Sequence, residues 1–205
     1  MNNMKLSAHT GINFQAQLLS KTKALKYDRD NGKYNDVPVS FVEVSPKDSD
    51  DMKSVRNAVE YWDGDLYGMN IANSMGTLRW STDENPSDKF FVITTQQKDF
   101  QKLNSDNIEA IAHIFETKKR VKVVHLQVNP DLIYTLEQPK YKHIGKSMID
   151  SLKDKYNDRS INLISSSTAQ RFYEKQGFNR TKDVENRYIW NEEAEADCEY
   201  KEEYW

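Results

Sequence analysis

The residues of this sequence best suited to chemistry surround Gly145, where a short polar loop enters a predicted helix. The first N–H groups of a helix have no partner within it, and the helix dipole adds a partial positive charge there. Lys142 and Lys146 stand on either side of the glycine and would strengthen that charge. The segment is therefore predicted to bind an anion, and phosphate is the usual anion at such a position.

A nucleotide-binding P-loop is the competing interpretation of the triplet Gly145-Lys146-Ser147. A P-loop needs another glycine five positions earlier, and position 140 holds lysine. It also begins directly after a strand, whereas Pro139 and Lys140 intervene here. The loop could not curl around a triphosphate, so a nucleotide-binding protein is a distant alternative.

The segments around this loop predict the elements that position it. Residues 121–128 are rich in β-branched residues and end at a turn signal, as a strand should. Residues 160–167 predict a second short strand, and residues 168–176 a helix that Gly177 stops. The predicted order is therefore strand, anion-binding loop, helix, strand and helix.

Two motifs in this order resemble the GNAT superfamily of N-acetyltransferases, over about residues 89–190. Lys142-His-Ile-Gly-Lys-Ser147 is similar to the family's pyrophosphate loop, Gln/Arg-x-x-Gly-x-Gly/Ala, with lysine and serine as departures. The segment from Ala169 to Phe178 contains Ala-x-x-Phe-Tyr-Glu-Lys-x-Gly-Phe, which is the more specific match. The family often has asparagine three residues before this alanine, where the chain has Ser166.

The resemblance implies an α/β fold with a mixed, mostly antiparallel central sheet flanked by helices. We expect a GNAT-like acyltransferase domain at residues 37–190, after an N-terminal extension at 1–36 and before an acidic C-terminal tail at 191–205. In the extension, an amphipathic patch near residues 12–25 favours a helix packed on the domain, with a frayed arm as an equal alternative.

The remaining elements follow from capping signals and hydrophobic periodicity. Asp48 or Ser49 can cap a helix over residues 50–62, and a second helical patch lies near residues 69–78. Residues 108–115 are ambiguous on propensity, and the family order favours a strand there. The other predicted strands are residues 37–44, 89–95 and 187–190.

The chemistry that the resemblance implies is direct transfer of acetyl from acetyl-coenzyme A to an amine, without a covalent enzyme intermediate. Gly145 would let the backbone approach the pyrophosphate. An ordinary turn glycine is the plainer interpretation. The main chain near Leu126 and Val128 would pair with the pantetheine arm. The implied cofactor-binding residues are Leu126, Val128, Lys142, His143, Ile144, Gly145, Lys146, Ser147 and Ser166.

Tyr173 is the predicted general acid. The departing thiolate needs a proton, and a phenol with a pKa near 10 is a suitable donor. Family members commonly use a tyrosine at this place. The alternative is a buried tyrosine whose hydroxyl is hydrogen-bonded.

The sequence does not identify a general base, although an amine with a pKa of about 10.4 must lose a proton. Strict alternation places Val124 and Lys122 in phase with Leu126, and neither is a base in its usual form. His125 has the right chemistry but is predicted to face the opposite side. His113, Glu109 and Asp131 are weaker candidates, and a water relay is a further route.

Two segments bear on the amine acceptor. Residues 129–138 are an insert relative to the family pattern, and they form either part of the acceptor wall or a surface loop. The acidic tail would attract a cationic acceptor such as a polyamine, an aminoglycoside or a lysine-rich peptide. A solvated tail is the favoured interpretation. The acceptor is therefore a small-molecule or peptide amine of unknown identity.

Composition fits one globular protein, with 205 residues, 37% hydrophobic and 30% charged. The single cysteine, Cys198, excludes an internal disulfide framework, and no apolar run follows Met1 or approaches a membrane span. The cytoplasm is the expected compartment. A net charge of −3 argues weakly against nucleic acid. No metal site is predicted, and the family often forms homodimers. A GNAT-like domain that has lost turnover and binds coenzyme A or a protein is the alternative function.

Overall fold

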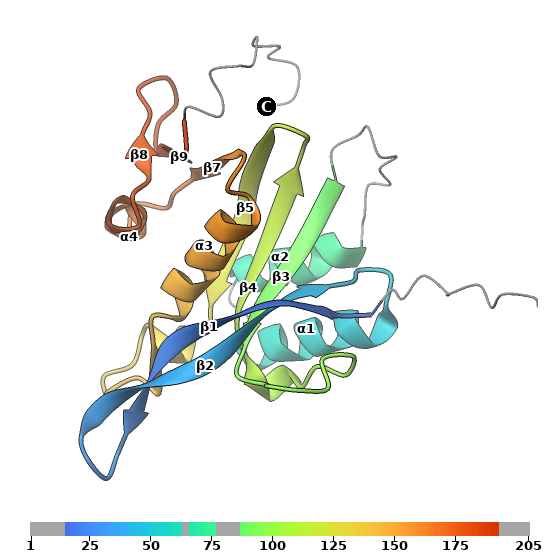
Figure 1. The fold of residues 1–205 in the computed structure, drawn as a ribbon, viewed down its shortest axis with the longest axis vertical. Coiled ribbons are helices and arrows are strands. Elements are labelled where there is room, and N and C mark those ends of the chain that lie inside the picture. The colour runs from blue at the N-terminus through green and yellow to red at the C-terminus, as the bar shows by residue number, and fades with distance from the viewer. Residues whose placement is uncertain (1–14, 63–65, 77–86, 193–205) are drawn as a thin grey trace, which may run out of the picture.

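The computed structural model describes residues 15–62, 66–76 and 87–192, in which nine strands form one open sheet with helices on both faces (Figure 1). The strands are β1 (Gln17–Asp28), β2 (Lys33–Val44), β3 (Ser87–Thr94), β4 (Ile108–Glu116), β5 (Arg120–Val128), β6 (Tyr141–Lys142), β7 (Ser160–Ile164), β8 (Asn179–Arg180) and β9 (Arg187–Trp190). The α-helices of this part are α1 (Ser49–Tyr61), α2 (Leu66–Gly76), α3 (Ile144–Lys155) and α4 (Gln170–Lys175), and 3-10 turns cover Ser105–Asn107 and Pro130–Leu132.

The strands lie in the order β6-β1-β2-β3-β4-β5-β7-β9-β8. Every neighbouring pair is antiparallel except β5 and β7, which are parallel. Two parallel strands need a crossover between them, and the chain from β5 to β7 passes through α3. The predicted α/β fold, with a mixed and mostly antiparallel sheet flanked by helices, is confirmed.

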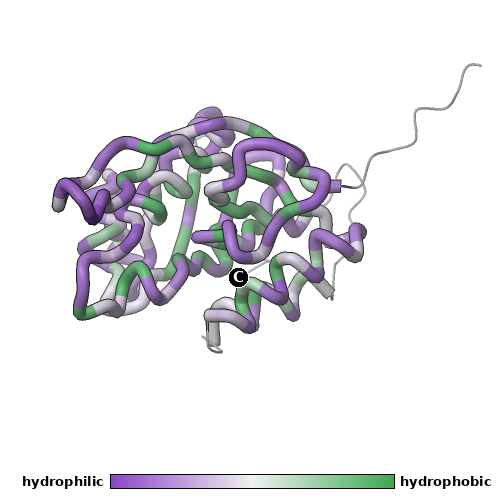
Figure 2. The backbone as a smooth tube through the Cα atoms, turned by 90° about the horizontal axis from the view of Figure 1, so that it is seen from below, coloured by the Kyte–Doolittle hydropathy of each residue, from purple (hydrophilic) through white to green (hydrophobic). Residues whose placement is uncertain are grey.

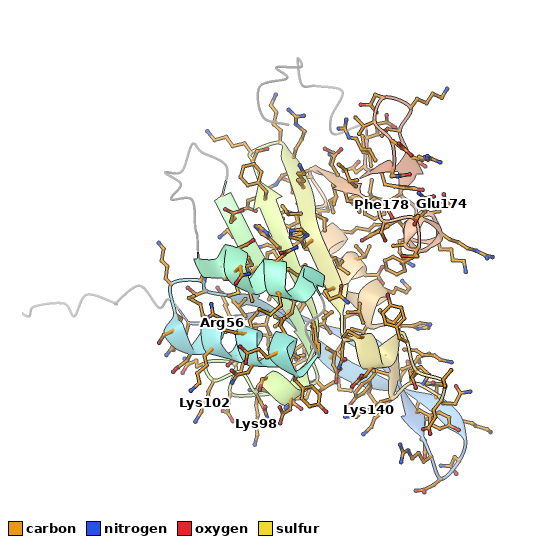
Figure 3. The ribbon with its side chains drawn as sticks, turned by 180° about the vertical axis from the view of Figure 1, so that it is seen from behind. Arg56, Lys98, Lys102, Lys140, Glu174 and Phe178 are labelled. Carbon is orange, nitrogen blue, oxygen red and sulfur yellow. The ribbon has the colours of Figure 1, made fainter. Side chains whose placement is uncertain are left out.

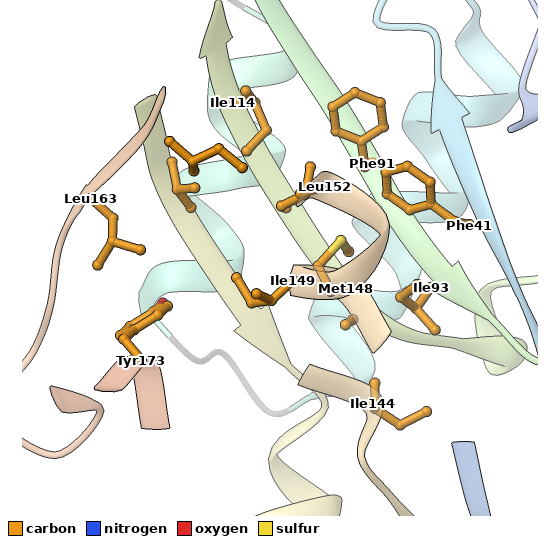
Figure 4. Packing of buried hydrophobic residues seen from close by; sticks show 14 of the residues in the cluster. Phe41, Phe91, Ile93, Ile114, Ile144, Met148, Ile149, Leu152, Leu163 and Tyr173 are labelled. Carbon is orange, nitrogen blue, oxygen red and sulfur yellow. The ribbon is translucent and has the colours of Figure 1, made fainter. Parts of the chain in front are cut away.

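Each face of the sheet carries its own hydrophobic core. On one face α1 and α2 pack their Val55 and Ile71 side chains into a cluster with Phe90 of β3. On the other face Met148 of α3 packs into a cluster with Phe91, the next residue of the same strand (Figure 4). The hydrophobic stretches of the backbone run through the inner strands, and the connections are mostly hydrophilic (Figure 2). Successive residues of the central strands are therefore buried on opposite faces.

Helix α1 begins where the capping signal predicts. Asp48 has an extended backbone, and its carboxylate accepts hydrogen bonds from the backbone N–H groups of Asp50 and Asp51. These acidic residues in the first turn also oppose the partial positive charge of the helix start. The predicted second helix and the predicted strands at 37–44, 89–95, 108–115, 121–128, 160–167 and 187–190 are present with shifted ends. Leu78 lies outside the described residues.

The helix predicted near residues 12–25 is wrong over Gln17–Leu25, which belongs to strand β1. β1 pairs with β2 along its whole length, and the tight turn between them contains Gly32 with a φ of 63°. The signal was the Asn31-Gly32 pair between two runs of strand length. The sheet therefore begins within the segment expected to be an extension, and not at residue 37. Residues 12–14 of the patch and 193–205 of the acidic tail lie outside the described residues.

Candidate active site

The parallel strands β5 and β7 pair over only four residues each. Their ladder joins Arg120–Val123 to Ser160–Leu163 and stops there, although β5 continues to Val128. Among the described strands, none pairs with residues 124–128 on this edge. Such an edge presents backbone N–H and C=O groups with which an extended ligand can pair. We call this place the β5–β7 divergence.

A β-bulge in β5 sets which side of the sheet its residues face. The residues paired with β4 skip from Val123 to His125, which leaves Val124 as an extra residue. Leu126 therefore packs in the α3-side core together with Val123. The expectation that Leu126 is in phase with Val124 and Lys122 is wrong, because one inserted residue shifts the alternation.

The loop that precedes α3 places the start of this helix beside the β5–β7 divergence. His143 adopts a left-handed backbone with a φ of 69° and makes no side-chain cap. The N–H of Ser147 donates to the carbonyl of His143, 2.8 Å away, and this is the first bond of the helix. The N–H groups of Ile144, Gly145 and Lys146 precede it, and none donates to another described residue. The predicted anion site is therefore an uncapped helix start.

Gly145 brings three elements together. A Cβ added here would lie 3.3 Å from Cγ2 of Val128 at the end of β5, and 3.4 Å from Cζ of Phe172 in α4. Its φ is not in the left-handed region, so close approach is the reason for glycine at this position. A Cβ at this position would require the side chain of Val128 or Phe172 to shift by a few tenths of an ångström, and a larger side chain would require more.

The lysines of the motif are exposed and already have partners. The Nζ of Lys142 lies 4.0 Å from the ring centroid of Tyr34 in β2, which is a cation–π contact. The Nζ of Lys146 lies 2.5 Å from Oδ2 of Asp150, one turn along α3. Lys140 lies toward the same end of the sheet, while Glu174 and Phe178 lie with α4 (Figure 3). Positive charge thus gathers near the helix start without a buried cation.

Ser147 attaches α3 to the N-terminal strand. Its hydroxyl is buried, 2.6 Å from the carbonyl oxygen of Lys23 in β1 and 3.0 Å from that of His143. Both donors of Ser147 are therefore used within the protein. The pairing of β6 with β1 and the bond from the N–H of Tyr27 to the carbonyl of Lys140 hold the same loop. β1 thus supports the loop, a role that the sequence did not reveal.

The other residues implied for the coenzyme lie around the divergence. Leu126 and Val128 are half-buried against the α3-side core, and the carbonyl of Val128 accepts a hydrogen bond from the side chain of Gln127 at 2.8 Å. Ser166 is exposed in the turn before α4, with its hydroxyl 3.2 Å from that of Thr168. The predicted residues thus come from β5, the α3 start and the β7–α4 turn.

Tyr173 extends from α4 into the α3-side core (Figure 4). Its ring is 7% exposed and packs edge-on against Phe172 and Phe178, with centroids 5.1 and 5.7 Å apart. Burial raises the pKa of this phenol to about 12. Within the described residues its hydroxyl makes no hydrogen bond, and its role as general acid stays a prediction.

The candidates for a proton acceptor occupy two places. His113 is stacked on Phe90 on the α1–α2 face, and its Nε2 lies 2.7 Å from Oδ1 of Asp88. The His125 ring lies on this face too, with its centroid 6.1 Å from that of His113. Glu109 is buried at the other end of β4, where its Oε2 accepts from the Asn129 amide. Burial raises the pKa of Glu109 and lowers those of both histidines.

The insert at 129–138 begins with the 3-10 turn at Pro130–Leu132, and it exposes the side chains of Ile133, Tyr134 and Leu136. Its end is held by the hydroxyl of Tyr34, which lies 2.9 Å from the carbonyl of Pro139. In the described part of the chain, no group of three or more His, Cys, Asp or Glu could hold a metal ion. None of the helices described there could span a membrane.

The fold and this arrangement define a class of protein, namely an α/β domain whose mixed sheet diverges beside a helix start. Residues 95–189 match the family model for the acetyltransferase (GNAT) domain. The resemblance to the GNAT superfamily that the two motifs indicate is confirmed by this match, which covers 95 of the 205 residues. No curated protein matches the sequence.

Solved structures with a similar fold have low sequence identity to this chain. They include a protein from Pyrococcus horikoshii (16% identity, TM-score 0.44, 70% of this chain and 44% of that chain). A second is a tandem GNAT protein from the clavulanic acid biosynthesis pathway, with 11% identity and a TM-score of 0.46; the match covers 70% of this chain and 45% of that chain. A third is the ribosomal-protein-S18-alanine N-acetyltransferase of Escherichia coli, with 14% identity and a TM-score of 0.43; the match covers 74% of this chain and 88% of that chain. The chain spans less than half the length of the first two. The resemblance to the family rests on the match of residues 95–189 and not on these structures.

Proposed function

We propose that this chain transfers the acetyl group of acetyl-coenzyme A directly to an amine. The observation that carries the proposal is that two features meet at Gly145: a strand edge with which no described strand pairs, and an uncapped helix start. An extended chain with an anionic end is the ligand that suits both features. Acetyl-coenzyme A has this form, because its pantetheine arm is extended and amide-bearing and its pyrophosphate is anionic.

The roles of the residues follow from their places. The N–H groups of Ile144, Gly145 and Lys146 would bind the pyrophosphate, with Lys142 and His143 beside them. The edge of β5 at Leu126 and Val128 would pair with the pantetheine amides, and Ser166 would border the arm from the other side. Ser147 would act through the attachment of α3 to β1. Tyr173 would give a proton to the departing sulfur, because its hydroxyl makes no hydrogen bond to any residue that the structure describes.

The acceptor is proposed to be an amine carried by a small molecule or a peptide. The exposed apolar side chains of the insert, Ile133, Tyr134 and Leu136, follow directly on β5 and would contact the part of the acceptor beyond the amine. The acetyltransferase domain is proposed to include β1, because β1 holds the phosphate-binding loop. A homodimer is the proposed assembly, only because dimers are common in the family that the chain resembles.

Thermal unfolding with acetyl-coenzyme A, and separately with ATP, tests the coenzyme. We expect stabilisation by acetyl-coenzyme A and none by ATP, and a Gly145→Val variant should lose the effect because its side chain would meet Val128 and Phe172. Release of free thiol with spermidine, kanamycin or oligolysine then tests transfer. Stabilisation by ATP alone would contradict the proposal. Binding without thiol release would favour a GNAT-like domain without turnover.

A further inference from the structure

We propose that His125 is the proton acceptor for the attacking amine, and that His113 and Asp88 position and polarise it from the neighbouring strands. The inference rests on the proposed acetyl transfer and supplies the base that the sequence did not identify. The three residues lie on β5, β4 and β3, on the sheet face covered by α1 and α2.

The first step of the argument is the fixed orientation of His113. Its Nε2 lies 2.7 Å from Oδ1 of Asp88, and its ring stacks on Phe90 with centroids 4.6 Å apart and planes 14° from parallel. A carboxylate accepts hydrogen bonds, so Nε2 carries the proton that is donated to Asp88. In the neutral ring Nδ1 is then a bare acceptor. This Nδ1 is fully buried and has no hydrogen-bond partner among the residues that the structure describes.

The second step is the contact between the two rings. His113 pairs directly with His125 across the β4–β5 ladder, next to the bulge, and the ring centroids are 6.1 Å apart at an angle of 40°. A lone pair that is buried and unsatisfied costs free energy. A proton gained by His125 would be favoured, because the new cation would lie next to His113 and to the Asp88 carboxylate bonded to it.

The third step is the place of His125 relative to the divergence. The ladder between β5 and β7 ends at Val123, two residues before His125. A ligand alongside residues 124–128 lies in the plane of the sheet and reaches both faces. His125 stands on the α1–α2 face and Tyr173 on the α3 face. The amine and the departing sulfur of one thioester would therefore meet different proton-transfer groups from opposite sides.

Among the described residues, the charged and titratable groups near His125 include His113, Asp88 and Lys122. His113 and Asp88 face it from β4 and β3, and Lys122 stands on the same face of its own strand. Helix α2, which packs against this part of β5, carries no charged residue. Burial and the neighbouring His113 lower the pKa of His125. The imidazole is thus neutral near pH 7 and ready to accept a proton.

The proposed step balances in atoms and charge. A neutral amine attacks the thioester carbonyl carbon, and the N–H proton passes to the imidazole of His125 as the C–N bond forms. The C–S bond breaks, and Tyr173 gives its proton to the sulfur. The proton on His125 returns through water to the phenolate, so the products are the amide and free coenzyme A.

The test is made on the full chain with acetyl-coenzyme A and whichever of spermidine, kanamycin or oligolysine the wild type acetylates. We expect His125→Ala to lower kcat by about 100-fold, the lower end of general-base effects, with the thermal stabilisation by acetyl-coenzyme A retained. Added imidazole should restore part of the rate in this variant, which a merely structural histidine would not allow. A rate within twofold of the wild type, or no response to imidazole, would overturn the proposal.

The positioning residues have a separate readout. Asp88→Asn removes the negative charge that favours the protonated form of His125, and the pKa of His125 should therefore fall. The acidic limb of log kcat against pH should then move to lower pH. Asp154→Asn, an exposed charge-matched change on α3, should leave the limb in place. An unmoved limb in Asp88→Asn would remove Asp88 and His113 from the mechanism. A wild type that releases no thiol would overturn the proposed function itself, and the role of His125 with it.

Discussion

At the scale of single residues, the hydroxyl of Tyr173 makes no hydrogen bond within the described part of the chain. Tyr188 packs against the Tyr173 ring, with ring centroids 6.3 Å apart, but the Tyr188 hydroxyl donates to Glu174. We expect Tyr173→Phe to lower kcat by roughly 100-fold with little change in the affinity for acetyl-coenzyme A, because only the proton donor is lost. Steady-state kinetics and thermal shifts measure the two quantities.

Tyr188→Phe is the matched control, since it removes a phenol of the same cluster and should leave kcat near the wild-type value. With a pKa of about 12, Tyr173 stays protonated at every pH in ordinary use. The wild-type rate should therefore show no alkaline decline caused by this group up to pH 10. An unchanged rate in Tyr173→Phe would remove the residue from the catalytic role.

A second residue, Asp51, makes the stability of the chain depend on pH. It is 1% exposed in the first turn of α1, and it accepts the N–H of Ser45 at 2.8 Å. Burial, with smaller contributions from Asp48 and Asp50, raises its pKa from 3.8 to about 6, and the Ser45 bond opposes the shift. The folded chain thus holds this proton more tightly than the unfolded chain, so the contribution to stability is lost as pH rises from 3.8 to about 6.

Asp51→Asn removes this titration and keeps an acceptor oxygen for the N–H of Ser45. We expect the change in melting temperature between pH 4 and pH 6.5 to be more positive in the variant than in the wild type, because the variant lacks the stability that the wild type loses over this range. Asp154→Asn, a change of the same kind at an exposed position on α3, should keep the wild-type slope. Calorimetry across this range measures both, and parallel curves for wild type and Asp51→Asn would contradict the assignment.

At the scale of elements, the N-terminal strand β1 supports the candidate site through α3. Ser147→Ala removes the donor to the carbonyl of Lys23, and a lost buried hydrogen bond costs about 1–3 kcal/mol of stability. For a chain of this size that corresponds to a fall in melting temperature of roughly 3 °C per kcal/mol. We also expect weaker binding of acetyl-coenzyme A, because the start of α3 loses an attachment.

Ser151→Ala is the control for this change. Ser151 is a buried serine one turn further along α3, and its side chain makes no hydrogen bond within the described residues. The control should alter neither the melting temperature nor the coenzyme affinity by a comparable amount. Equal effects of the two substitutions would show that the Ser147 bond to β1 is not what matters.

The elements also show what local patterns can predict. The helix after Gly145 and the central strands are found from capping, periodicity and glycine, because each signal lies within the element. Three features depend on partners distant in the sequence, namely the pairing of β1 with β6, the bulge at Val124 and the contact of Asp88 with His113. The bulge cannot be read from the composition of β5, and yet it reverses the predicted facing of Val123 and Lys122 relative to Leu126.

At the scale of the whole molecule, the sheet has a weak seam. The part that contains β7, β9 and β8 joins the remaining strands through the four-residue ladder between β5 and β7. Acetyl-coenzyme A alongside β5 would contact both sides of this seam, from the start of α3 to the turn before α4. A ligand that binds only when the strands on both sides of the seam are in place stabilises this folded state by about 2.7 kcal/mol, at a ligand concentration 100 times its dissociation constant.

Hydrogen exchange can locate this stabilisation. We expect acetyl-coenzyme A to slow exchange in β7, β9 and α4 and at the start of α3, and to leave the exposed tip of the β1–β2 hairpin unchanged. Coenzyme A without the acetyl group should protect the same elements, because the pyrophosphate and the pantetheine arm make the contacts, and ATP should not. Protection confined to α1, with none across the seam, would place the ligand elsewhere and contradict the proposed site.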